Sequence, residues 1–464
     1  MSTIWLPELT EWRGAKYKGI AEAISRDIQQ GRLNPDQKLP THRALADALG
    51  VTTGTVTRAY AEAERRGLVY AVVGSGTFVR GAEAGGREWR FTEEQPEGLI
   101  ELHLNRPLKT DRADLFARAM RALATHPAQI NQLLDYQPDI GVEAHRRAIC
   151  DWLARDGWRP EAEQVVISNG GQHALLVALM ALTRAGDTVL AEALTYPGFT
   201  AAARQLKLQV RSVAMDGEGI LPESLESVCR QTAPRVLFCT PSLQNPTTAT
   251  MSPARRKAVL EICRRHELIV IEDEVSVGLA EGLPLPLAAF APERTLLIGS
   301  FSKSLAAGVR VGYLVAPVRL QSRLGAAVRA SCWMVSPLMV ALVCEWIRDG
   351  SAQRLLAAQR EEIAARMRIA LQRLRNFTLS SQPGGLHLWL QLPEPWREDE
   401  FVTAAQARGV MVLGASSFCV GRGAVPHAVR ISVSAAGNRQ QLVKGLDLLL
   451  ELLHEGPESM PALL

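Results

Sequence analysis

Apolar residues at helical spacing mark the first elements of the chain. Tyr17, Ile20, Ile24 and Ile28 recur at intervals of three and four residues, which predicts an amphipathic helix over residues 16–30. Two shorter helices and two strands are expected to follow, over residues 43–49, 53–67, 68–73 and 77–79. Three helices followed by a hairpin indicate a small α+β domain.

From about residue 100 the pattern changes, and apolar runs alternate with helical segments. The runs that read as buried strands include residues 165–168, 188–191, 236–240, 268–272 and 295–299. Alternation of strands with helices predicts a mainly parallel sheet covered by helices, which is an α/β domain.

The last part of the chain repeats this style on a smaller scale. A long helix is expected first, then three strands and a helix, over residues 353–374, 385–391, 410–413, 429–433 and 439–453. We interpret this part as a small C-terminal subdomain over about 330–464.

Residues 81–98 are rich in Gly and Glu without apolar periodicity, which is typical of a linker. The chain therefore divides into an N-terminal domain over 1–80, this linker, and a large domain over 99–464. Two domains also agree with its 464 residues, because single cores rarely exceed roughly 250–300 residues.

Charge is unevenly placed along the chain. The net charge is only +4, which argues against a protein that is basic throughout, such as a histone-like or ribosomal protein. Residues 1–80 carry 11 Lys and Arg against 8 Asp and Glu, or +3, and the other residues carry 41 against 40, or +1. A basic N-terminal part hints at nucleic acid, although a solvated basic face has the same composition.

The seven cysteines are widely spaced and form no Cys-x-x-Cys pair, which favours reduced thiols over a disulfide framework or a metal site. The N-terminus lacks the apolar core of a signal peptide, and no segment reads as membrane-spanning. We expect a cytoplasmic protein that holds no metal and binds no membrane.

Small hydroxyl side chains stand at the start of the third predicted helix. Thr52, Thr53 and Thr55 follow a short turn after the second helix. At a helix N-terminus such side chains suit contacts to phosphates and base edges, because free N–H groups face the ligand there. A small protein-interaction domain, in which Thr52 only caps the helix, is the alternative on spacing alone.

A longer motif makes the DNA-binding interpretation specific. Residues 39–68 read Leu-Pro-x-x-Arg-x-Leu-Ala-x-x-Leu-Gly-Val-(x)4-Val-x-x-Ala-Tyr-(x)6-Gly-Leu, and Gly-x-Gly-Thr-Phe follows at 74–78. Residues 16–80 thus resemble the winged helix-turn-helix of GntR-type bacterial transcription regulators. The resemblance implies that Arg43 contacts a phosphate or a guanine edge, that the three threonines line the start of the recognition helix, and that Gly76 lies at the wing tip.

The chain departs from this family at Thr53, where Arg is usual. Loss of that guanidinium removes a bidentate guanine contact. The resemblance therefore implies that operator preference depends more on Arg43 and Arg58.

A lysine among small hydroxyl residues follows the predicted strand 295–299. Lys303 lies close to Ser300 and Ser302, and Arg310 comes seven residues later. An aldehyde cofactor that carries a phosphate needs such a set, with the amine for a Schiff base and the hydroxyls and guanidinium for the dianion. An isolated lysine in a loop is more often simply solvated.

Other polar residues follow predicted strands in chain order, and each has a plain structural alternative. Gly171 and Gln172 form a strand-to-helix turn that suits phosphate but is also an ordinary tight turn. Tyr196 offers a face for stacking or packs in a core, and Asn245 before Pro246 is a donor or merely part of a turn. Asp273 places a carboxylate at the sheet edge where ligands gather, or lies in a solvated loop.

Together with Arg430 in Val-Arg-Ile-Ser, these sites make residues from about 100 to 455 resemble fold-type I aminotransferases, which use pyridoxal 5′-phosphate (PLP). The resemblance implies that Lys303 forms the Schiff base, Asp273 pairs with the pyridinium nitrogen, and Asn245 bonds the ring O3′. Tyr196 would stack on the ring and Arg430 would bind the α-carboxylate of an amino acid. The residues implied for the phosphate are Gly171, Gln172, Ser300, Ser302 and Arg310.

Two positions depart from the pattern. Aminotransferases commonly carry Tyr three residues after the ring-nitrogen Asp, and this chain has Ser276. Relatives with the DNA-binding module often carry His where this chain has Leu243. The first change implies a Schiff base less well poised for catalysis, and the second alters the ligand pocket.

A winged helix fused through a linker to an aminotransferase-like domain is the layout of the MocR subfamily of bacterial regulators, which this chain resembles throughout. The resemblance implies a head-to-tail homodimer that binds double-stranded promoter DNA and senses an amine, an amino acid or PLP itself. An active amino-acid aminotransferase with an appended DNA-binding module is the competing function. A regulator that responds to PLP alone is a third.

Overall fold

The structure is a computed structural model that describes residues 5–8, 14–34, 37–66, 68–72, 76–79, 98–108, 112–155, 157–421 and 425–457. The predicted linker over 81–98 lies outside these residues except for its last position, as do Gly67 and wing residues 73–75.

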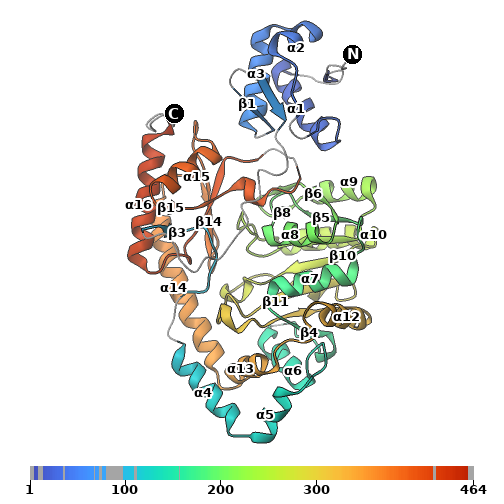
Figure 1. Ribbon diagram of the computed structural model, residues 1–464, viewed down its shortest axis with the longest axis vertical. Helices are drawn as coiled ribbons and strands as arrows, with labels where there is room; N and C mark the ends of the chain where they lie inside the picture. Colours follow the sequence, from blue (N-terminus) through green and yellow to red (C-terminus); the bar gives the residue numbers. More distant parts are fainter. Residues whose placement is uncertain are drawn as a thin grey trace.

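The N-terminal domain, called the head below, consists of three helices and a hairpin (Figure 1). Its elements are α1 (Lys16–Gln29), α2 (His42–Leu49), α3 (Thr53–Arg65), β1 (Val69–Val72) and β2 (Gly76–Val79), and the two strands pair antiparallel. Capping explains where α2 and α3 begin, because Thr41 Oγ1 accepts from the N–H of Ala44 and Thr52 Oγ1 from that of Thr55. Ile20, Ile24 and Leu45 lie in its core, so the predicted amphipathic helix is confirmed.

The large domain is built on a seven-stranded sheet. In spatial order the strands are β4 (Val165–Ser168), β12 (Gly312–Val315), β11 (Thr295–Ser300), β10 (Ile269–Asp273), β9 (Val236–Cys239), β5 (Thr188–Glu192) and β6 (Gln209–Val213). The neighbours from β11 to β6 are parallel, and only β12 runs antiparallel to both of its neighbours. The prediction of a mainly parallel sheet is therefore confirmed.

Helices cover both faces of this sheet (Figure 1). One face packs on α7 (Gly171–Leu182), α8 (Pro197–Gln205) and α12 (Gln321–Cys332), with Phe238 and Ile271 pointing to that side. The other face packs on α6 (Glu143–Leu153), α9 (Pro222–Thr232), α10 (Pro253–Arg265), α11 (Leu287–Phe290) and α13 (Pro337–Arg348). Leu237 and Val270 point to this second side, because successive side chains of a strand point to opposite faces of the sheet. Helices α4 (Ala113–Ala124) and α5 (Pro127–Leu134) lie at the lower end of the molecule in Figure 1.

A second, smaller sheet forms the C-terminal subdomain. Its strands are β13 (Leu379–Ser380), β14 (His387–Gln391), β17 (Ala428–Ser432) and β16 (Leu413–Gly414), and its helices are α14 (Ser351–Arg373), α15 (Glu398–Ala407) and α16 (Arg439–Glu455). The four longest predicted elements of this part, at 353–374, 385–391, 429–433 and 439–453, are present with small changes at their ends.

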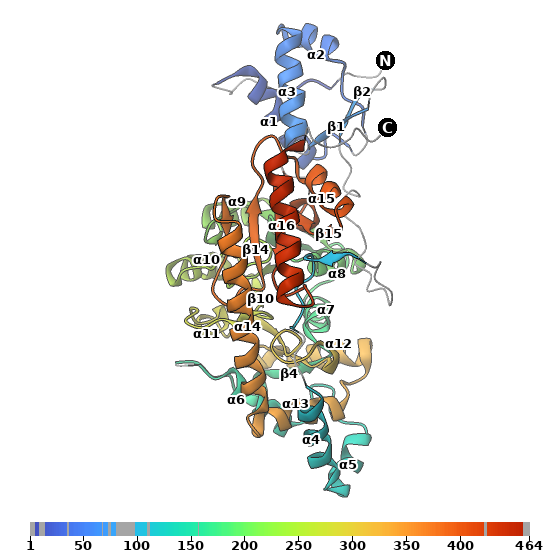
Figure 2. The same ribbon diagram turned by 90° about the vertical axis from the view of Figure 1, so that its left-hand side faces the viewer.

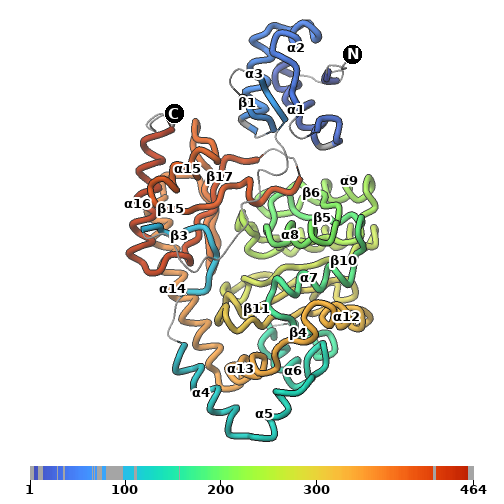
Figure 3. Tube along the Cα trace, in the orientation of Figure 1, coloured from blue at the N-terminus to red at the C-terminus, as the bar shows by residue number. Residues whose placement is uncertain are grey.

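The boundary of the small subdomain differs from the expected range of about 330–464. Strand β3 (Ile100–Glu101) pairs in parallel with β15 (Val410–Met411), and Ile100 and Leu102 lie in the core of the small subdomain (Figure 3). Helix α13, by contrast, packs in the core of the large sheet. A two-residue strand carries no periodicity of its own, so its pairing with a segment 310 positions away left no signal in the sequence.

The head contacts the small subdomain through the C-terminal end of α3. Arg397 Nη2 donates to the carbonyl oxygen of Glu64 at 3.2 Å, and the N–H of Val425 donates to the carbonyl oxygen of Arg66 at 3.1 Å. The side chain of Arg66 bonds Glu62 and, on α1, Glu22. Figure 2 shows this end of α3 directly above the small subdomain.

No single helix among the described residues is long and apolar enough to cross a membrane. One pair of helical segments, Val318–Cys332 and Pro337–Arg348, meets the length and composition test only together, with a bend of 120° between them.

Candidate functional site

A cavity of about 1930 Å³ lies between the large sheet and the small subdomain. Its lining includes every residue that the sequence assigned to the cofactor and to its ligand: Gly171, Gln172, Tyr196, Asn245, Asp273, Ser300, Ser302, Lys303, Arg310 and Arg430. Strand ends of the large sheet supply most of them, as parallel sheets place ligand sites at their carboxyl edge. The cavity extends as far as Ile28 and Leu68 of the head.

Lys303 lies in the turn after β11, and its amine points at the segment that follows β3. Its Nζ donates to the carbonyl oxygen of Asn105. Burial, together with the positive charge of Arg430, lowers the pKa of Lys303 from 10.5 to about 8, although the charge of Asp273 opposes the shift. A lysine with such a pKa supplies a neutral amine near physiological pH, which is the nucleophilic form.

Hydrogen-bond donors for an anion gather at the N-terminus of α7. Ser300 Oγ donates to Ser302 Oγ at 3.0 Å, and Arg310 Nη1 lies 3.4 Å from the same Ser302 oxygen. Arg310 Nη2 also donates to the carbonyl oxygen of Asn169 at 3.1 Å. Gly170 has a φ of +83°, and a Cβ there would lie 2.5 Å from the Arg310 guanidinium, so only glycine fits this turn.

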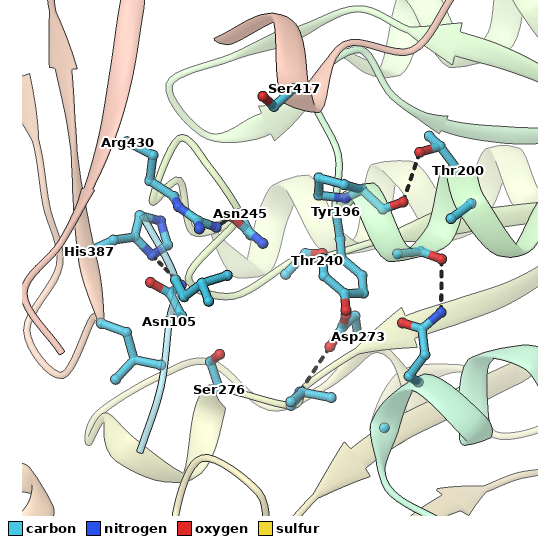
Figure 4. Close-up of a pocket in the computed structure, with 18 of the residues that line it drawn as sticks. Asn105, Tyr196, Thr200, Thr240, Asn245, Asp273, Ser276, His387, Ser417 and Arg430 are labelled. Carbon is cyan, nitrogen blue, oxygen red and sulfur yellow. Dashed lines mark hydrogen bonds between the residues drawn. The ribbon is translucent and has the colours of Figure 1, made fainter. Parts of the chain in front are cut away.

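Asp273 and Tyr196 lie near each other in the middle of the cavity (Figure 4). Asp273 Oδ1 accepts from the N–H of Val275 at 3.0 Å, and burial raises the pKa of the carboxyl to about 6. The ring of Tyr196 packs against Gly198, where a Cβ would lie 2.3 Å from a ring carbon. Gln172 Nε2 donates to the carbonyl oxygen of Gly198 at 2.9 Å and so joins α7 to the Tyr196 turn.

Arg430 is buried and already engaged. Its Nη1 donates to Asn245 Oδ1 at 2.6 Å, its Nη2 donates to the carbonyl oxygen of His103, and its guanidinium lies 4.9 Å from the centre of the Phe418 ring. Arg430 Nε is buried and has no hydrogen-bond partner among the described residues. Because Asn245 Oδ1 accepts from Arg430, the Asn245 amide nitrogen remains as the donor on the other side.

Two residues that the sequence did not single out also line the cavity. Asn105 Nδ2 donates to His387 Nδ1 at 2.9 Å (Figure 4). His387 Nε2 donates to the carbonyl oxygen of Pro246 at 3.0 Å. The carbonyl accepts, so the proton of the neutral ring is on Nε2. Burial lowers the pKa of His387 to about 3. His387 begins β14 shortly after Gly384 and Gly385, and a polar residue inside this apolar strand was a signal in the sequence, whereas Asn105 had none.

The residues present fit PLP. The cavity holds an anion site at a helix N-terminus, a partly neutral lysine and a buried carboxylate within one wall. These are the groups that a phosphate, an aldehyde and a pyridine nitrogen require.

The predicted DNA-contacting residues lie on the head, away from the cavity. Arg43, Thr53, Arg58 and Gly76 are exposed. The Thr52 and Thr55 hydroxyls are 2.9 Å apart, and Thr52 caps α3. The hydroxyls of Thr52 and Thr55 are thus engaged at the start of α3, whereas the exposed side chains of Arg43, Thr53 and Arg58 are available to contact DNA.

Comparison with known proteins agrees with both parts. Residues 16–79 match the model for bacterial regulatory proteins of the gntR family, and residues 97–449 match that for aminotransferase class I and II. The uncharacterized HTH-type transcriptional regulator YdeF of Bacillus subtilis is 31% identical over 97% of this chain and 97% of its own length. This chain belongs to the MocR subfamily of GntR-type transcriptional regulators.

Another relative of this MocR-type regulator is the HTH-type pyridoxine biosynthesis transcriptional regulator PdxR of Corynebacterium glutamicum, which is 29% identical over 87% of this chain and 89% of its own. An archaeal alanine:glyoxylate aminotransferase superposes with a TM-score of 0.69 at 25% identity, over 77% of this chain and 91% of the enzyme. The aminotransferase fold of the regulator implies PLP.

Proposed function

We propose that this regulator binds PLP in the cavity and changes its binding to double-stranded promoter DNA when an amine, an amino acid or PLP itself enters. The observation that carries the proposal is the meeting of Lys303, Asp273, Asn245, Arg310 and Arg430 in one cavity of a chain that also has a DNA-binding head. A DNA-binding regulator works where the chromosome is, so we expect it in the cytoplasm.

PLP, when bound, supplies an aldehyde and a ring that withdraws electrons. Lys303 offers the neutral amine for that aldehyde, and Asp273 holds a proton at the ring nitrogen. The Asn245 amide nitrogen donates to O3′, and Tyr196 covers the ring. Phosphate binding falls to the following set: Gly171, Gln172, Ser300, Ser302 and Arg310.

Arg430 is the residue we assign to the carboxylate of an amino-acid effector. Its planar guanidinium matches a carboxylate in two parallel hydrogen bonds. That carboxylate would replace the carbonyl oxygen of His103 and compete with Asn245 for the same donors. Effector binding therefore breaks the hydrogen bond that holds the 103–106 segment to Arg430. An effector that binds more tightly when this bond is broken favours one arrangement of the subdomains over the other.

We further propose a head-to-tail homodimer as the functional unit. Tyr136 and Trp333 support it, because their side chains are exposed and their ring centres are 6.0 Å apart at one end of the large domain. Exposed aromatic pairs of this kind are typical of protein interfaces. The measurement is the molar mass in solution, and a monomer at micromolar concentration would contradict the proposal.

The test of the function combines two readouts on the full chain. PLP should produce a visible absorbance band, and amines or amino acids that change this band should also change the anisotropy of labelled promoter DNA. Lys303→Ala should lose both responses while it retains basal DNA binding. A normal DNA response of Lys303→Ala to every ligand would contradict the proposal.

Retention of Lys303, Asp273 and Arg430 favours an aminotransferase as the second candidate. Steady conversion of an amino acid with a keto acid, independent of DNA, would support the enzyme. Turnover limited to one equivalent per chain would support the regulator.

A further inference from the structure

Two fully buried polar side chains lie beneath the cavity, and neither contacts it directly. Glu192 is the last residue of β5, and Gln244 lies in the loop after β9; both are 0% exposed. Gln244 Nε2 donates to Glu192 Oε2 at 3.1 Å, and Glu192 Oε1 accepts from the N–H of Thr240 at 3.2 Å. These bonds join the ends of two neighbouring parallel strands.

The side-chain amide of Gln244 forms four hydrogen bonds, two through its nitrogen and two through its oxygen. Besides Glu192, its Nε2 donates to the carbonyl oxygen of Leu194 at 2.7 Å. Its Oε1 accepts from the N–H of Thr247 at 2.9 Å and from Thr247 Oγ1 at 2.7 Å. Because a backbone N–H donates to Oε1, the orientation of the amide is fixed by its neighbours.

These contacts hold together the two segments that carry predicted ring contacts. Leu194 is two residues before Tyr196, and Gln244 is the residue directly before Asn245. Asn245 is held from the other side by Arg430. The amide nitrogen that we assign to O3′ is therefore directed by Arg430 on the side chain and by Gln244 on the backbone.

We propose that Glu192 and Gln244 form a positioning pair that sets Asn245 and Tyr196 for the cofactor and thereby tunes the protonation of the bound PLP. The inference rests on the proposed function, because it assumes that PLP occupies the cavity. Neither residue is a catalytic residue; both act through Asn245 and Tyr196.

The electrostatics of Glu192 agree with this role. Burial raises the pKa of Glu192 to about 8, and the charge of Asp273 contributes to the shift. At neutral pH the pair thus links the two strands without placing a second full negative charge beside Asp273. Asp273 then remains the carboxylate that faces the ring.

The test measures PLP binding and the pH midpoint of the visible band in full-length variants. Gln244→Leu removes all four hydrogen bonds at similar volume. We expect PLP to bind about tenfold more weakly and the pH midpoint to rise, because a donor to the ring oxygen favours its deprotonated form. Thr247→Val removes one hydroxyl donor to Gln244 and should shift the midpoint less, in the same direction.

Glu272→Gln is the matched control. Glu272 is also 0% exposed, it lies on β10 on the other side of β9 from Glu192, and burial raises its pKa as well. Its oxygens instead accept from the N–H groups of Leu287 and Ala288 on α11. Glu272→Gln should lower the melting temperature without moving the pH midpoint, whereas Glu192→Gln should move it.

The outcomes separate the two claims. A wild-type chain that shows no visible band with PLP overturns the proposed function, and the positioning pair with it. A wild-type band together with an unchanged midpoint and affinity in Gln244→Leu and Thr247→Val overturns the positioning pair alone. An equal midpoint shift in Glu272→Gln also overturns it, because the effect would then follow general destabilisation.

Discussion

Burial of Lys303 sets the pH at which its amine becomes available. Its pKa of about 8 lies below the usual 10.5, so the neutral form appears as pH rises through about 8. Because only the neutral amine attacks an aldehyde, PLP binding should strengthen over roughly pH 7 to 9. A PLP titration followed by visible absorbance at several pH values measures this.

Pyridoxine phosphate is the control ligand, since it carries the phosphate and ring but no aldehyde. Its affinity should not rise through this pH range. An equal rise for both ligands would mean that phosphate binding, and not Lys303, carries the dependence.

Thr53 is a second residue with a measurable consequence, because it is exposed at the start of α3. Thr53→Arg adds a cation at the end of the helix that we expect in the major groove. It should strengthen DNA binding and steepen the dependence of log K on log salt by about 1. Gln231→Arg, exposed on α9 of the large domain, adds the same charge elsewhere and should leave the slope unchanged.

Residues that follow strands were within reach of sequence reasoning, and residues defined by distant partners were not. Lys303 and Asp273 each follow an apolar run, so their place at a sheet edge could be predicted. Asn105 and His387 are 282 positions apart, and only the folded chain brings them into contact. Their roles, like those of the predicted site residues, stay predictions until ligands are measured.

At the scale of elements, one glycine lets two segments approach. A Cβ at Gly312 on β12 would lie 2.6 Å from the carbonyl carbon of Gly170 and 2.9 Å from the carbonyl oxygen of Gly299. Gly312→Ala should therefore displace the anion-binding turn at α7. We expect a loss of about 1–3 kcal/mol in stability and weaker PLP binding, measured by thermal unfolding and titration.

Gly308→Ala is the control for this substitution. Gly308 lies nearby in the Ala307–Val309 turn, and a Cβ there meets nothing within 4 Å. Its stability should be unchanged or slightly higher. A similar loss for both variants would contradict the close-approach argument.

Element prediction succeeded where periodicity was long. Helix α14 was expected over 353–374 and spans Ser351–Arg373, because its length gives many turns of pattern. Strands β6 and β12 were not among the predicted strands. Three of the five residues of β6 are exposed, and β12 has only four residues, so neither run stood out.

At the scale of the molecule, two hydrogen bonds attach the end of α3 to the small subdomain. The double variant Arg397→Ala/Val425→Pro removes both donors to Glu64 and Arg66. Each bond contributes about 1 kcal/mol, so the head should detach more often and the radius of gyration in X-ray scattering should rise. Arg408→Ala, which breaks the ion pairs with Glu455 and Glu451 within the small subdomain, should leave the scattering unchanged.

The pairing of β3 with β15 has a consequence for how ligand binding in the cavity would change DNA binding by the head. The chain segment that follows the head and the linker enters the small subdomain at β3. The head is therefore joined to the small subdomain both through the chain and through hydrogen bonds. A hinge motion between the subdomains would carry the head along as a rigid extension. In the proposed dimer such a motion changes the separation of the two heads, and operators with different half-site spacing would then select the ligand-free or the ligand-bound form.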